Sequence, residues 1–267
     1  MISVKPSFQW IALIVGIFAF TSCTPNQNKD VANEVAKSVF VEQPSDASRV
    51  LVFSKTKGFY HESIPSGIEA MQKLGNENGF QVDTTKNARQ FTVENLKKYR
   101  AIVFLNTTED VLNDQQQDAM ESYIQGGGGF VGVHAAADTE YKWPWYNKLV
   151  GAYFKSHPNN PNVRKAVVDV VYKDHLATKH LPERWERSDE WYNYKDINPD
   201  IKVLARLDET SYEGGENGNN HPIIWYHDYD GGRSFYTGGG HTEESFRDPV
   251  FMRHLLGGIE YAMGNQK

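Results

Sequence analysis

The feature that most constrains this chain is a glycine-rich hinge that leads into a short apolar segment and ends on a histidine: residues 126–138 read GGGGFVGVHAAAD. Glycine permits the positive φ and the tight turn that can feed a strand, and residues 130–133 are short and apolar enough for a central parallel strand. His134 stands where that strand should stop. Ligands collect outside the carboxyl ends of strands in open α/β sheets, so His134 is the first candidate for a functional residue, the plain alternative being a histidine that merely caps a turn.

The residues around His134 also follow the small-x-polar-x-small pattern of a nucleophile elbow, Gly132-Val133-His134-Ala135-Ala136. Small flanking residues let two backbones approach each other at such a turn. The apex residue is histidine, not Ser or Cys, so the pattern predicts the geometry of an elbow without its usual nucleophile.

Upstream of the hinge, apolar runs alternate with helical patterns. Strands are expected at 49–54, 80–84 and 100–106, with helices after each of them. Asn113, with Gln116 three residues later, gives the last of these helices a capping-box start. The β-α-β-α-β-α-β order predicts a parallel sheet with right-handed crossovers and helices on both faces. We therefore expect an α/β three-layer sandwich with a mostly parallel central sheet, of flavodoxin-like or class I glutamine amidotransferase-like layout.

After Asp138 the pattern loosens, and residues 139–162 are expected to form a loop. Further strands are expected at 163–172, 201–207, 222–226 and 232–237, before a last helix at 250–263. Three histidines in this half, His175, His180 and His254, are expected at the surface.

The composition excludes some classes of function. A formal net charge of -6 gives no basic footprint for nucleic acid, and neither a Walker loop nor a Gly-x-Gly-x-x-Gly follows the first strand, so no nucleotide cofactor is expected. Aromatic residues make up 13% of the chain, and aromatic rings in clefts are a common means of holding sugars.

The N-terminal region has the pattern of an export signal. Lys5 precedes an apolar run at residues 8–20, which has the length of a signal-peptide core and is too short for a comfortable membrane span. The run ends in FTSC, which resembles a bacterial lipobox, and Cys23 is the only cysteine of the chain. We expect residues 1–23 to be a lipoprotein signal peptide with its lipidated cysteine, residues 24–48 a flexible tether, and residues 49–267 the domain. The protein would then be exported and lipid-anchored in the bacterial cell envelope, in the periplasm or at the cell surface; a plain signal peptide with an incidental cysteine is the alternative.

Polar residues follow several of the expected strands. His61 follows the first strand, His134 the fourth, and His241 follows a second glycine run at 238–240. With Glu190 as a carboxylate, these histidines form a candidate acid/base or metal constellation. Two of these residues also have a structural alternative: His61 as a helix cap, and Glu190 as a solvated carboxylate. Because no metal-binding motif of fixed spacing is present, the sequence does not decide whether a metal binds. The ligands of such a metal would come from His61, His134, His157, Glu190 and His241.

Five segments, taken together and in this order, resemble the ThuA-like (trehalose utilisation) family: FYHESI at 59–64, GGGFVGVH at 127–134, SHP at 156–158, DEWY at 189–192 and GGH at 239–241. The resemblance covers residues 49–267. It implies a class I glutamine amidotransferase-like domain in which His134 replaces the elbow cysteine, so the thiol-based glutaminase reaction is ruled out for lack of a nucleophile. It also implies a role in sugar catabolism, in company with sugar oxidoreductases and keto-sugar-processing enzymes.

The leading hypothesis is an envelope-anchored enzyme, a hydrolase, lyase or isomerase, that acts on a small carbohydrate or keto-sugar. We expect the catalytic groups to be His134, His241 and Glu190, and the substrate-binding residues to be His61, His157, Trp143, Trp191 and Asp138. A divalent metal is a second hypothesis, and contact with the membrane is expected only through the lipid anchor. The competing hypothesis is a non-catalytic carbohydrate-binding module that serves partner enzymes; a homo-oligomer is left open.

Overall fold

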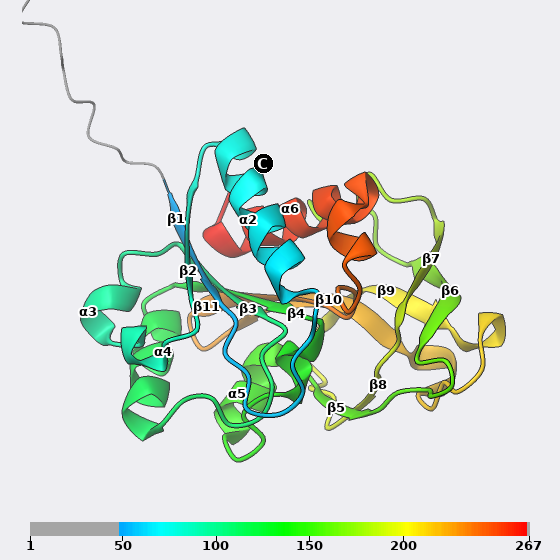
Figure 1. Ribbon diagram of the computed structural model, residues 1–267, viewed down its shortest axis with the longest axis horizontal. Helices are drawn as coiled ribbons and strands as arrows, with labels where there is room; N and C mark the ends of the chain where they lie inside the picture. The colour runs from blue at the N-terminus through cyan, green and yellow to red at the C-terminus, as the bar shows by residue number, and fades with distance from the viewer. Residues whose placement is uncertain (1–47, 266–267) are drawn as a thin grey trace, which may run out of the picture. The chain divides into compact units, whose positions relative to one another are not determined.

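The computed structural model describes residues 48–265, which build a nine-stranded mixed sheet flanked by helices (Figure 1). The strands lie in the order β2-β1-β3-β4-β11-β10-β9-β6-β7. The first five of these pair in parallel and form the half of the sheet that carries the site: β2 (Gln81–Thr85), β1 (Arg49–Phe53), β3 (Ala101–Leu105), β4 (Gly129–Val133) and β11 (Gly232–Thr237).

Two groups of helices cover the parallel half. α2 (Ile64–Asn78) and α6 (Pro249–Met263) lie on one face, and α3 (Val93–Leu96), α4 (Asp114–Gln125) and α5 (Pro144–Val150) lie on the other (Figure 1). Every residue of β3 and β4 is buried, which explains their uninterrupted apolar sequences, because a central strand covered on both faces has no exposed side. The expected α/β fold is confirmed.

The other half of the sheet is an antiparallel extension. β10 (Pro222–Tyr229) forms a hairpin with β11, and β9 (Lys202–Asp208), β6 (Val163–Val170) and β7 (Arg184–Glu190) continue it. A separate two-stranded sheet joins β5 (Tyr153–Ser156) to β8 (Asn193–Lys195).

Local signals set several boundaries. The side chain of Asn113 accepts from the backbone N–H of Gln116, whose side chain accepts from the backbone N–H of Asn113, so the expected capping box is confirmed. The expectation of a loop over residues 139–162 is wrong in two places, because α5 and β5 form there. The sequence also did not reveal β7 and β8.

The four-glycine run closes the turn between α4 and β4. Only Gly127 has a positive φ, +91°. A Cβ on Gly128 would lie 2.4 Å from the ring of Tyr123, and one on Gly129 would lie 2.0 Å from the carbonyl oxygen of Ala262 in α6. The run therefore lets the helices pack against the sheet, at the end of β4 opposite His134.

Three histidines expected at the surface are placed otherwise. His254 is fully buried in α6, where its Nδ1 lies 2.8 Å from the carbonyl oxygen of Ala177 and its Nε2 lies 3.1 Å from Oγ1 of Thr237. His175 is also buried, and His180 is half-buried. The expectation was wrong for His254 and His175. Both ring nitrogens of His254 have polar partners in the core, and Nδ1 of His175 accepts from the backbone N–H of Ala177 at 3.1 Å.

The predicted signal peptide, its Cys23 and most of the predicted tether lie outside the described residues. Within residues 48–265, no helix is both long enough and apolar enough to cross a membrane.

Candidate functional site

Three histidines gather at the carboxyl edge of the parallel strands. His61 lies in the loop after β1, His134 follows β4 directly, and His241 follows β11 and its glycines. The chain leaves β1 for β2 on one side and then crosses to β3 on the other. Sites form at such a reversal of strand order, since the connecting loops diverge there and leave a crevice.

His134 has the geometry of an elbow. Its φ is +46°, in the left-handed region that a residue with a Cβ seldom adopts. A Cβ on Gly132 would lie 3.2 Å from the Cβ of Ala136 and 2.9 Å from the ring of Tyr236, so only glycine fits beneath the turn. The hydroxyl of Tyr236 donates to the carbonyl oxygen of His134 at 2.7 Å. The turn is thus held in a strained conformation, and the imidazole that it carries contacts Glu190 and His241.

The imidazoles of the three histidines surround one carboxylate. Oε2 of Glu190, at the end of β7, lies 3.2 Å from Nε2 of His134 and 3.1 Å from Nδ1 of His241. Those two nitrogens are 3.3 Å apart. The His61 ring stands edge-on to both histidines, with centroid distances of 5.1 and 5.0 Å. We call these four residues, His61, His134, Glu190 and His241, the His/Glu cluster; one donor atom from each lies within 4.8 Å of the others.

A second layer of contacts fixes the cluster. The carbonyl oxygen of Gly238 lies 2.9 Å from Nδ1 of His134. The amide of Asn162 donates to Oε1 of Glu190 at 2.8 Å and lies 3.5 Å from Nε2 of His241. The buried carboxylate of Asp189 accepts from the backbone N–H of His241 at 3.0 Å.

Burial decides the charge of several groups. Burial, together with the neighbouring His134 and His241, lowers the pKa of His61 to about 2, so its ring is neutral. Burial alone would raise the pKa of Glu190, but the close contacts with His134 and His241 hold it well below its ordinary value. Burial raises the pKa of Asp138, although its bond from the Tyr141 hydroxyl acts in the opposite direction.

A cavity of about 230 Å³ opens beside the cluster. It reaches two members of the cluster, His61 and Glu190, and its other walls are Phe59, Asp138, Phe154, His157, Asn162 and Tyr192. The Phe59 side chain stands at the rim, 64% exposed. Nε2 of His157 lies 3.7 Å from Oε1 of Glu190. The predicted residues His157 and Asp138 therefore line the same cavity.

Trp143 and Trp191, expected to stack on a sugar, do not line this cavity. Trp143 is buried against Trp145, with a centroid distance of 4.9 Å, and donates to Glu121. Trp191 is buried and donates to the carbonyl oxygen of Arg164. Aromatic walls come instead from Phe59, Phe154 and Tyr192, and Tyr192 packs on His134 with a centroid distance of 4.2 Å.

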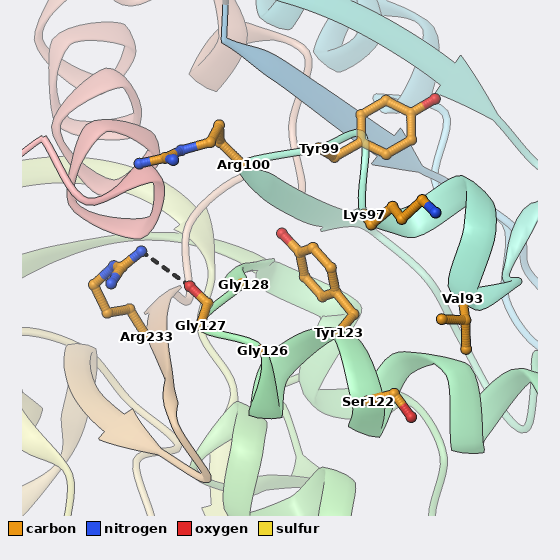
Figure 2. Close-up of a pocket in the computed structure, with 10 residues that line it drawn as sticks. All are labelled: Val93, Lys97, Tyr99, Arg100, Ser122, Tyr123, Gly126, Gly127, Gly128 and Arg233. Atoms are coloured by element: carbon orange, nitrogen blue, oxygen red, sulfur yellow. Dashed lines mark hydrogen bonds between the residues drawn. The ribbon is translucent and has the colours of Figure 1, made fainter.

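A cavity of about 450 Å³ lies elsewhere, at the turn between α4 and β4 (Figure 2). Its arginines have structural partners: Arg233 donates to the carbonyl oxygens of Gly127 and Ala262, and Arg100 donates to that of Met263. The bonds to Ala262 and Met263 satisfy C-terminal carbonyls of α6 and suit the negative end of the helix dipole. None of the predicted site residues lines this cavity.

Comparison with known proteins decides the family. Residues 49–262 match the family model described as ThuA, trehalose utilisation. The chain belongs to the ThuA family. A search of curated proteins gives no match.

Solved structures agree with this assignment. The ThuA-family chain is 27% identical to a ThuA-like protein from Bacteroides uniformis, with a TM-score of 0.69 over 81% of this chain and 92% of that one. It is 21% identical to a ThuA-like protein from Parabacteroides merdae, with a TM-score of 0.65 over 83% and 92% of the two chains. A β-galactosidase from Bacillus circulans sp. alkalophilus shares the fold alone, at 13% identity and a TM-score of 0.54 over 82% of this chain and 32% of that one.

Proposed function

We propose that this ThuA-family protein is an enzyme that converts a sugar or keto-sugar at the His/Glu cluster. The observation that carries the proposal is the position of the cluster beside a small cavity with an aromatic rim and polar walls. Strained backbone at His134 and a carboxylate buried among imidazoles cost stability, and such costs concentrate at functional sites.

The cluster suits chemistry that moves protons. Histidine changes its charge near neutral pH and serves as a general acid or base. Hydrolysis, elimination and isomerisation beside a carbonyl all require such a group. The elbow position holds His134, so the thiol chemistry of glutaminases has no nucleophile here.

The cavity suits a single sugar ring. Its volume of about 230 Å³ is below the roughly 300–1,000 Å³ of pockets for drug-sized ligands, which favours one monosaccharide unit. The Phe59 ring offers an apolar face at the rim, and Asp138, His157 and Asn162 offer polar groups inside. Thr108 accepts from the backbone N–H of Gly58 at 3.2 Å and donates to the carbonyl oxygen of Phe59 at 3.0 Å, so the loop is fixed before any ligand binds.

Turnover separates this proposal from a binding role. A panel of sugars and their keto forms would be incubated with wild-type protein, His134→Ala, His241→Ala and the control His180→Ala, and the products followed by NMR. We expect wild type and His180→Ala to convert one member and the two cluster variants to lose at least about 100-fold in rate, as acid/base groups contribute 10²–10⁴-fold. Unchanged turnover in both cluster variants would refute the assignment. Binding without conversion across the panel would favour a carbohydrate-binding module.

We also propose that the protein is anchored in the cell envelope through Cys23. Support comes from the sequence alone, the apolar run at residues 8–20 followed by FTSC. Mass spectrometry of the mature protein from a bacterial host should show an acylated N-terminal cysteine. A mature protein without an acyl mass shift would contradict the anchor.

A further inference from the structure

We infer that the His/Glu cluster is a binding site for one divalent transition ion of the zinc type. The inference rests on the proposed function for what the ion does, but the site is argued from geometry alone. Imidazole nitrogens with a carboxylate oxygen are donors that Zn²⁺ and its first-row neighbours prefer, whereas Mg²⁺ and Ca²⁺ prefer oxygen.

The spacing of the donor atoms fits a common centre. Metal–ligand bonds of about 2.0–2.2 Å place neighbouring donors roughly 3.0 Å apart in an octahedron and roughly 3.3–3.5 Å apart in a tetrahedron. The three contacts among Nε2 of His134, Nδ1 of His241 and Oε2 of Glu190 measure 3.2, 3.1 and 3.3 Å. These atoms therefore form one triangular face of a coordination shell.

The tautomer of His134 gives a second reason. Its Nδ1 faces the carbonyl oxygen of Gly238 at 2.9 Å, and a carbonyl oxygen only accepts, so the hydrogen belongs on Nδ1. In the neutral ring, Nε2 then directs a lone pair at a carboxylate oxygen of Glu190, another acceptor. Two acceptors at this distance repel unless a cation lies between them. A proton on Nε2 would instead make a buried ion pair of the His134 ring with Glu190, so binding of the ion must displace that proton.

His61 supplies an independent observation. Its side chain is 2% exposed, and its buried Nδ1 has no hydrogen-bond partner among the described residues. Buried polar atoms without partners are rare in native proteins. One ring nitrogen of His61 belongs to the set of donor atoms that lie within 4.8 Å of one another, so a cation in the cluster would have His61 as a fourth ligand within reach.

The surroundings resemble those of ligating side chains in general. Metal-binding histidines usually donate their second nitrogen to a carbonyl or carboxylate, and ligating carboxylates are themselves hydrogen-bonded. The carbonyl oxygen of Gly238 accepts from the second nitrogen of His134, and the amide of Asn162 donates to the carboxylate of Glu190. The adjoining cavity reaches His61 and Glu190, which leaves a side of the site open to a hydroxyl or carbonyl oxygen of a sugar. An ion there would polarise that oxygen as a Lewis acid, and this role would replace the acid/base role of His134 and His241, because their lone pairs would then bind the ion.

The test measures binding without any assay of turnover. Protein without a polyhistidine tag would be stripped with chelator, dialysed and titrated calorimetrically with Zn²⁺ and, separately, Mg²⁺, with elemental analysis of the dialysed product. We expect one Zn²⁺ per chain and no binding of Mg²⁺. Glu190→Gln and His134→Ala should weaken Zn²⁺ binding at least about ten-fold, since even outer partners of a metal site are worth 10–100-fold, while His180→Ala should bind as wild type does.

Circular dichroism of each variant checks folding. The visible absorption of cobalt-loaded wild-type protein tests the site without any variant. Co²⁺ bound to imidazole and carboxylate should produce visible absorption bands that an equivalent of Zn²⁺ removes. Absence of stoichiometric Zn²⁺ in wild type, or equal binding by wild type and both folded cluster variants, would overturn the inference.

The outcomes separate the site from the proposed function. Sugar turnover by wild-type protein that takes up no stoichiometric Zn²⁺ would overturn the metal site and leave the proposed function standing. One Zn²⁺ per chain without conversion of any sugar in the panel would support the metal site and refute the proposed function.

Discussion

Replacement of Asp189 by asparagine should cost several kcal/mol, because this carboxylate joins the scaffold to the site. It is fully buried and lies 3.0 Å from Nη2 of Arg187, whose guanidinium is packed over Phe251 at 4.4 Å from the ring centroid. Its oxygens also accept from four groups: the backbone N–H groups of Glu190, Gly240 and His241, and the hydroxyl of Ser245.

The magnitude follows from the bonds that the asparagine side chain of Asp189→Asn can keep. Its one carbonyl oxygen can still accept from the N–H groups of Glu190 and His241. Its NH₂ group would face the three donors of the lost oxygen: Arg187, the N–H of Gly240 and the hydroxyl of Ser245. Removal of one partner of a buried ion pair costs about 3–5 kcal/mol. For a domain of this size each kcal/mol lowers Tm by about 2–4 °C, so we expect a fall of roughly 6–20 °C.

Urea unfolding followed by tryptophan fluorescence measures the loss directly, and an unchanged m value would show that the unfolding transition is the same. Arg187→Met and the double variant complete a cycle, in which the double variant should lose less than the sum of the single losses, by about 1–3 kcal/mol. A loss below about 1 kcal/mol for Asp189→Asn, or additive losses in the cycle, would refute this account of the ion pair.

Three further predictions concern other parts of the molecule. Phe59→Ala should raise KM for the sugar about 2–10-fold with little change in kcat, as expected for loss of one stacking contact worth roughly 0.5–1.5 kcal/mol; a fall in kcat at constant KM would contradict a recognition role. Gly129→Ala, whose Cβ would lie 2.0 Å from the carbonyl oxygen of Ala262, should cost about 1–3 kcal/mol or more in urea unfolding yet leave KM unchanged; altered KM with intact stability would link the glycine run to the site. Burial and the nearby Arg187 lower the pKa of His254 to about 3, so the unfolded chain takes up a proton below about pH 6.5 while the folded one does not. The contribution of neutral His254 to the free energy of unfolding should therefore be fully present above pH 6.5 and be lost as pH drops towards 3. The free energy of unfolding should fall less steeply with pH in His254→Gln, and equal slopes would contradict this.

The parallel half of the fold could be predicted because its signals are local. β3 is an unbroken apolar run, α4 begins at a capping box, and a helix separates each of the strands β1 to β4 from the next. α5, β7 and β8 escaped prediction for physical reasons. α5 has only seven residues, too few for a clear helical pattern. β7 has the sequence RWERSDE, whose many charged residues do not look like a buried strand. Asp189 and Glu190 are nevertheless buried, because their contacts come from segments distant in the sequence.

The site shows the same division. His61, His134 and His241 were predictable because each follows a strand and parallel topology collects strand ends at one edge. The cavity walls Phe154 and Asn162 were not, since they lie in segments that meet the cluster only through packing. The histidines in the core looked like surface residues because their contacts are distant in sequence: the carbonyl oxygen of Ala177 for His254, and the ring of Tyr226 for His175.

The most direct test of the central claim is a crystal structure of Glu190→Gln soaked with a sugar that the wild-type protein converts. We predict the sugar ring in the cavity beside Phe59, with a hydroxyl or carbonyl oxygen within hydrogen-bond reach of the His/Glu cluster. A sugar bound in the cavity lined by Arg100 and Arg233, or anywhere else away from the cluster, would contradict the account.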